Sequence, residues 1–158
     1  MQSLVEPLVV SLGWRSERPG PSQFVDEQQW QGTRDPAAYL AVPAAIAFEA
    51  EHDWESVRRG CHALLQRAAA GIRNLTGQAP LWTSDRWYGQ LASFPLPPCD
   101  PETLSRRLRD EYRVEVPAFT WNGRPLLRVS VQGYNTEPDI EALITALRSA
   151  LPRAQRTT

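Results

Sequence analysis

The chain has no lysine, because all 17 of its Lys and Arg residues are arginines. By itself, this chain therefore cannot perform chemistry that needs a lysine amine. Such chemistry includes Schiff-base formation with a carbonyl group and phosphate binding by the lysine of a P-loop. Histidine is almost as rare: His52 and His62 are the only two, and they do not stand at the spacing of a zinc site. The motifs Gly-x-Ser-x-Gly, His-Glu-x-x-His and Gly-x-Gly-x-x-Gly are absent. The sequence therefore gives little support to the interpretation that this chain is a self-contained hydrolase or metalloenzyme.

Cysteines and long apolar runs are also scarce. Cys61 and Cys99 cannot form a disulfide framework. Cys61 falls on an apolar stripe and is expected in the core, whereas Cys99 lies in a proline-rich loop where exposure is possible. No apolar run approaches the roughly 20 residues of a bilayer span, and the N-terminus has no basic signal-peptide region. We therefore expect a reduced, cytoplasmic protein with no membrane segment.

The arginines are balanced by 18 acidic residues, which leaves a formal net charge of -1. The densest basic stretch, Arg106 to Arg113, is interleaved with Asp110 and Glu111. Such mixed charge is typical of a solvated helix face, so we expect no nucleic-acid partner.

The first half of the chain, residues 1–77, contains two predicted helices. Asp35-Pro36 is a helix start, and residues 37–48 are apolar nearly all round, so we expect this helix to be buried on several sides and bent at Pro43. A second helix is predicted from Asp53 to near Gly77. Its expected inner stripe has helical spacing and consists of Val57, Cys61, Leu64, Leu65, Ala68 and Ile72.

Residues 78–158 change in character and predict a small domain with the order β-α-β-β-α. Strands are expected at residues 90–94, 114–119 and 126–131, with a tight turn at Asn122-Gly123 between the last two. Asp100-Pro101 and the capping box Thr136–Asp139 each begin a helix. The predicted fold class is α+β with a mainly antiparallel sheet.

Two segments have the composition of ligand sites. Gly32-Thr33-Arg34-Asp35-Pro36 places a glycine and a hydroxyl before a helix N-terminus, which suits a phosphate but is also what an ordinary N-cap turn looks like. Arg128 lies in the middle of a predicted strand among apolar neighbours. Its guanidinium can pair with a substrate carboxylate, or it can belong to an exposed strand face or a structural ion pair.

Together these segments resemble the C-terminal half of pyridoxal-phosphate enzymes of the aminotransferase class V family. The similarity is greatest to isopenicillin N epimerase-like members, which are related to the cysteine desulfurases. It covers nearly all of the chain. The stretches that carry it are Glu6–Ser11, Gly13-Trp14, Phe24 through Trp30–Pro36, the helix from Asp53, Leu127–Ser130, Tyr134–Thr136 and Asp139-Ile140.

The resemblance implies a fold-type-I homodimer with a large cofactor domain, a smaller C-terminal domain and active sites at the subunit interface. It implies that Gly32 and Thr33 contact the cofactor phosphate of the partner subunit. It also implies that Arg128 binds the α-carboxylate of an amino-acid substrate. Residues 1–77 would then be an interdomain and dimer-interface segment, and residues 78–158 the small C-terminal domain.

The main departure from the family is that the Schiff-base lysine and the cofactor domain that carries it have no counterpart here. Smaller departures are Leu12, where relatives tend to carry Trp, and Gln132-Gly133. We therefore expect an inactive C-terminal portion, either truncated or one chain of a split enzyme whose partner supplies the missing N-terminal domain. The alternative is a stand-alone, non-catalytic module that binds a small carboxylate or a protein.

Overall fold

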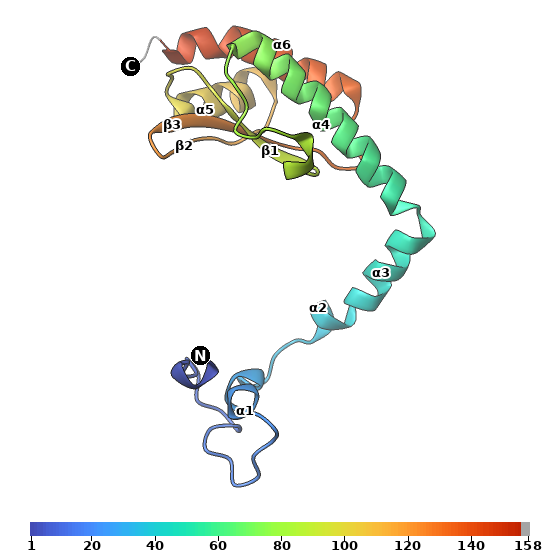
Figure 1. The fold of residues 1–158 in the computed structure, drawn as a ribbon, viewed down its shortest axis with the longest axis vertical. Helices are drawn as coiled ribbons and strands as arrows, with labels where there is room; N and C mark the ends of the chain where they lie inside the picture. The colour runs from blue at the N-terminus through green and yellow to red at the C-terminus, as the bar shows by residue number, and fades with distance from the viewer. Residues whose placement is uncertain (156–158) are drawn as a thin grey trace. The chain divides into compact units, whose positions relative to one another are not determined.

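The computed structural model describes residues 1–155, which form two compact units, one ending at Phe48 and one beginning at Glu49. In chain order the helices and strands are η1 (Gln2–Leu4), α1 (Gln23–Gln29), α2 (Ala37–Leu40), α3 (Val42–Glu51), α4 (Trp54–Thr76), η2 (Asp85–Trp87), β1 (Leu91–Pro95), α5 (Pro101–Tyr112), β2 (Ala118–Trp121), β3 (Arg124–Ser130) and α6 (Glu137–Gln155) (Figure 1). The predicted division between residues 77 and 78 lies within the second unit, just after α4 ends at Thr76, and it stays a prediction.

Helix α1 in the first unit was not expected from the sequence. The Ser22 side chain caps it by accepting a hydrogen bond from the Val25 amide. The helix is anchored to the preceding loop, because the Gly20 amide donates to the Asp26 carboxylate at 2.7 Å. Gly13 approaches so closely that a Cβ there would lie 1.5 Å from the Asp26 carbonyl oxygen. Only glycine fits that position without moving the backbone.

The apolar segment 37–48 forms two helices rather than one bent helix. Helix α2 ends at Leu40, and Pro43 lies in the first turn of α3. A proline ring clashes with the carbonyl four residues earlier and lacks an amide donor, so the helix is interrupted where we expected a bend. The expectation of burial is wrong for these helices, neither of which contains a buried residue. Their exposed side chains include Leu40, Ile46 and Phe48.

Helix α4 in the second unit matches its sequence signals. The Asp53 carboxylate accepts from the Ser56 amide at the start, and Gly77 ends the helix in the left-handed conformation, its amide donating to the Arg73 carbonyl at 2.8 Å. The capping hydrogen bonds lower the pKa of Asp53. The members of the predicted stripe that are buried are Cys61, Leu65, Ala68 and Ile72.

The sheet is antiparallel, with strand order β1-β3-β2, and α4, α5 and α6 lie on one of its faces (Figure 1). The predicted α+β class and the order β-α-β-β-α are confirmed. Fully buried leucines and isoleucine join the sheet to these helices, namely Leu65, Ile72, Leu104, Leu108, Leu127 and Leu147. Burial of such side chains contributes about 1.5–3 kcal/mol each, which makes this layer the main source of stability of the second unit.

The strands begin and end at residues that differ from their predicted bounds, and the largest difference is at the start of β2. We expected a strand at residues 114–119, but β2 begins only at Ala118. The Val114 amide is used to close α5, donating to the Leu108 carbonyl at 2.9 Å, and Pro117 has no amide to donate. The apolar alternation of Val114 and Val116 therefore reflects packing against the core rather than pairing in the sheet. The turn at Asn122-Gly123 is confirmed, with positive φ at both residues.

The capping residues of α5 and α6 also act as predicted. Asp100 accepts hydrogen bonds from the Glu102 and Thr103 amides and from the Thr103 hydroxyl, which lower the pKa of its carboxyl group. Asp139 accepts from the Thr136 amide at 2.8 Å, which is the returning half of the capping box. Both hydrogen-bond sets satisfy amides that a helix start leaves without partners.

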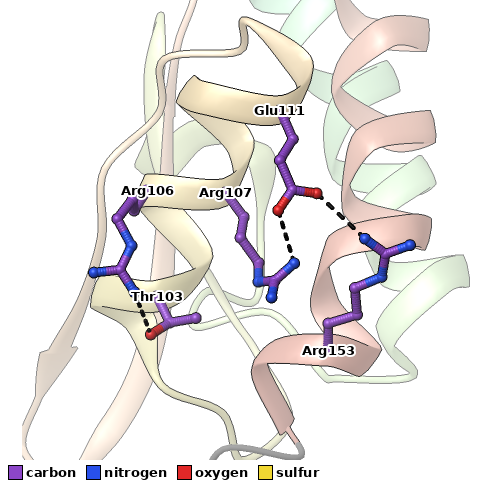
Figure 2. Close-up of polar contacts among 5 residues, drawn as sticks. All are labelled: Thr103, Arg106, Arg107, Glu111 and Arg153. Carbon is purple, nitrogen blue, oxygen red and sulfur yellow. Dashed lines mark hydrogen bonds and ion pairs between the residues drawn. The ribbon is translucent and has the colours of Figure 1, made fainter.

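The basic stretch on α5 pairs with nearby acids. Glu111 accepts from Arg107 at 2.7 Å and from Arg153 of α6 at 3.3 Å, so its carboxylate links the two helices (Figure 2). Arg106 donates to the Thr103 hydroxyl in the same view, and Arg109 pairs with Asp110 at 2.9 Å. This pairing agrees with the expected solvated helix face.

Both cysteines are free and buried, so the possibility of an exposed Cys99 is wrong. Cys99 is 8% exposed, and burial is the main cause that raises the pKa of its thiol, which disfavours the reactive thiolate. Within residues 1–155, no helix is long and apolar enough to cross a membrane.

Candidate functional site

The face of the sheet that the helices leave uncovered carries Arg128. Successive residues of a strand point to opposite faces, and Arg128 pairs with Ser93 of β1. Ala92, Leu127 and Val129 are buried on the helix side, whereas Arg128 is exposed. The strand therefore holds this arginine on the open side of the sheet.

The Arg128 guanidinium has no hydrogen-bond or ion-pair partner among residues 1–155, although its backbone amide donates to the Pro117 carbonyl at 2.9 Å. Of the alternatives for this residue, a structural ion pair is therefore wrong for the described chain. An arginine held by a paired strand and free of carboxylates offers a planar fork that matches an incoming carboxylate.

Apolar side chains border Arg128 on the same open face. Phe119 pairs with Leu126 across β2 and β3, and Trp121 pairs with Arg124, so both aromatic residues share the face of Arg128. Trp121 is 61% exposed, and Leu91 at the opposite edge is 49% exposed. A cation that shares a sheet face with exposed apolar side chains is suited to a ligand or a polypeptide that excludes water from the ion pair.

Gly32 and Thr33 lie in the first unit, in a bend between α1 and α2. Gly32 has φ of 112°, a region that glycine adopts readily, and Thr33 is exposed. Helix α2 has only four residues, and the Asp35 carboxylate already accepts from the Ala37 amide at 2.9 Å. The helix start thus adds little to a phosphate site, and any phosphate contact depends on the Gly32 backbone and the Thr33 hydroxyl.

Arg34 does not serve as a free cation beside this bend. Its guanidinium donates to the Gln29 carbonyl at 3.2 Å and lies 5.3 Å from the centre of the Tyr39 ring. These contacts tie the side chain to the ends of the flanking helices. Of the three predicted site residues, Gly32 and Thr33 lie in the first unit and Arg128 lies in the second. Their assignment to a ligand stays a prediction.

Pyridoxal phosphate requires an amino group as well as contacts to its phosphate. The sequence supplies no lysine, so Gly32, Thr33 and Arg128 do not by themselves make up a site for the whole cofactor. No group of three or more His, Cys, Asp or Glu residues within the described part of the chain can hold a metal ion.

A cavity that the sequence analysis missed lies between the second half of α4, the segment 78–88 and β1. It has a volume of about 190 Å³, and its walls include Trp82, Tyr88 and Phe94. The Trp82 ring centre is 4.8 Å from that of Tyr88 and 5.4 Å from that of Phe94. Three aromatic residues in a short segment, Trp82, Trp87 and Tyr88, were the available signal, but the convergence of Trp82 and Tyr88 on Phe94 depends on how residues 78–88 fold back over α4.

Comparison with known proteins finds isopenicillin N epimerases as relatives. The chain is 34% identical to an isopenicillin N epimerase of Amycolatopsis lactamdurans over 92% of its own length, and 30% identical to an isopenicillin N epimerase of Streptomyces clavuligerus over 83%. It spans only 39% and 33% of the lengths of these two relatives. No family model matches the chain.

Solved structures of cysteine desulfurase type have the same fold. A cysteine desulfurase from Escherichia coli matches with a TM-score of 0.62 at 20% identity, covering 88% of this chain and 35% of that one. A NifS-like protein matches with a TM-score of 0.64 at 17% identity, covering 94% of this chain and 39% of that one. The predicted resemblance is therefore confirmed: the chain is similar to part of class V aminotransferase-like enzymes, and its fold is that of part of the fold-type-I structures it matches.

Proposed function

We propose that this chain is the substrate-binding C-terminal portion of a pyridoxal-phosphate enzyme that acts on an amino acid, of the epimerase or aminotransferase type. The observation that carries the proposal is the unpaired Arg128 guanidinium on the open face of the sheet. In the proposed enzyme Arg128 binds the substrate α-carboxylate. Gly32 and Thr33 contact the cofactor phosphate of a partner subunit, in a homodimer of the family's kind.

The chain is inactive alone in this proposal, because no side chain in it offers the lysine amine that holds the cofactor. A lysine-bearing cofactor domain is the required partner, whether as the N-terminal part of the same polypeptide or as a separate chain. A neighbouring reading frame that encodes such a domain would support the split form. The proposed location is the cytoplasm, and neither nucleic acid nor a membrane is a proposed partner.

Exposure of the purified chain to pyridoxal phosphate followed by borohydride should fix the cofactor at the Met1 amino group and at no side chain. Borohydride makes permanent a bond between an aldehyde and an amine, and the sequence contains no side-chain amine of lysine. Peptide mass spectrometry locates the label, and a lysine-containing protein treated in parallel shows that the reagent works. Label on any internal peptide would overturn the proposed inactivity, as would turnover of an amino acid by the pure chain.

The isolated chain is also expected to self-associate or to require a partner. Tyr39, Leu40, Ile46 and Phe48 are between 49% and 73% exposed, and apolar surface of this kind usually marks a contact with another polypeptide. Light scattering on dilute protein should give a mass above that of a monomer, and a hydrophobic dye should bind. A monomer that does not bind the dye would contradict this expectation and would favour the stand-alone carboxylate-binding module.

A further inference from the structure

We propose that the cavity beside α4 binds a small aromatic carboxylate, with its ring against Trp82, Tyr88 and Phe94 and its carboxylate on Arg73. All of these residues belong to the second unit. The inference therefore depends neither on the proposed reaction nor on a missing cofactor domain.

The walls of the cavity are aromatic and held in place by one another. Trp82 meets Phe94 nearly edge to face at an interplanar angle of 75°, and the Tyr88 ring contacts both the Trp82 ring and the His62 ring, whose centre is 5.1 Å away. The His62 Nδ1 atom hydrogen-bonds the Gly89 carbonyl at 3.0 Å, which fixes the segment behind Tyr88. A preformed aromatic wall binds a flat ring without losing side-chain freedom.

The size of the cavity fits one ring. Ile72 and Phe94, at 1% and 4% exposure, contribute its most deeply buried side chains. An apolar protein cavity of about 150 Å³ accommodates benzene. The volume here is about 190 Å³, which leaves room for one small substituent on a six-membered ring.

Two polar side chains of the lining are already occupied. The Gln66 amide donates to the Asp85 carboxylate at 2.6 Å, and the Thr76 hydroxyl donates to the Ile72 carbonyl at 2.8 Å while it accepts from the Gln78 amide. These groups therefore hold the walls together, and neither carries a charge that a ligand could pair with.

Arg73 is the one charged residue among those described that line the cavity. Its guanidinium has no hydrogen-bond or ion-pair partner within residues 1–155, whereas the carboxylate of Asp85 lies outside the lining. A pocket with aromatic walls and a single free cation suits a ligand with one negative group on an aromatic body. The planar guanidinium is matched best by a carboxylate.

The test is a titration of the isotope-labelled chain with benzoate, followed by NMR at the indole N–H of Trp82. Benzoate should give a saturable shift, whereas benzamide, which has the same shape without the charge, should bind about tenfold more weakly. Acetate, which has the charge without the ring, should give no saturable shift. Arg73→Gln should reduce benzoate affinity about tenfold and leave benzamide unchanged, and the exposed control Arg124→Gln should alter neither.

The proposal fails if benzoate produces no saturable shift at Trp82 up to its solubility limit. Equal affinity for benzoate and benzamide would also overturn it, because the charge would then play no part. The comparison of ligands uses the unaltered chain, so it stays decisive even if Arg73→Gln disturbs the fold. A negative result leaves the proposed function standing, because Arg128 belongs to a different face of the unit.

Discussion

Replacement of Leu127 by alanine should lower the free energy of unfolding of the second unit by about 3 kcal/mol. Leu127 lies on the central strand β3, is 0% exposed, and pairs with Phe94 on one side and with Ala118 on the other. Truncation removes its packing against the helix layer and leaves a cavity that the paired strands cannot close. Urea unfolding followed by circular dichroism measures the loss, which corresponds to a melting temperature roughly 10 °C lower or more.

Leu91→Ala is the matched control for this change. It makes the same truncation in the same sheet, but Leu91 is 49% exposed on the open face. Its effect should be below about 1 kcal/mol, because much of the side chain is already in contact with water. Equal effects of the two substitutions would mean that the helix layer is not the core of the unit.

Arg128→Ala should raise the KM for the amino-acid substrate about 100-fold once a lysine-bearing cofactor domain restores activity. Two charge-assisted hydrogen bonds to a carboxylate disappear, and 100-fold corresponds to about 2.7 kcal/mol. The dissociation constant of the cofactor should change little, because Arg128 is proposed to contact the substrate alone. Steady-state kinetics and cofactor titration separate the two quantities.

Arg128→Lys should fall between the native chain and the alanine variant, since an ammonium keeps the charge but not the two-pronged geometry. Arg124→Ala, at the exposed start of the same strand, should leave KM unchanged. If Arg128→Ala weakened cofactor and substrate equally, the residue would be structural. An unchanged KM would place the carboxylate site elsewhere.

Local sequence signals identified the helices of the second unit well. Asp53, Asp100 and Thr136 were recognised as helix starts because capping involves residues only two or three positions apart. The apolar stripe of α4 has the period of a helix that packs on one side, and its buried members follow that period. The signals failed where a backbone hydrogen bond competes, as at Val114, whose amide closes α5 instead of joining the sheet.

The first unit was harder to read from its sequence. Helix α1 is largely polar, and only its capping serine and the close approach of Gly13 to Asp26 explain its position. The apolar residues 37–48 were expected to be buried, yet they are exposed. Apolar composition indicates that a segment tends to pack against another surface, but it does not show that the same chain provides that surface.

The sequence by itself determined the fold class, the resemblance to a known family and the lack of any lysine, because periodicity, capping and residue inventory are properties of short stretches or of composition. The tertiary structure decided which face of β3 remains open, that Arg128 has no carboxylate partner among the described residues, and that Trp82, Tyr88 and Phe94 enclose a cavity beside Arg73. Burial and pairing depend on residues far apart in the chain, so alternation along one strand cannot show which of its faces the helices cover.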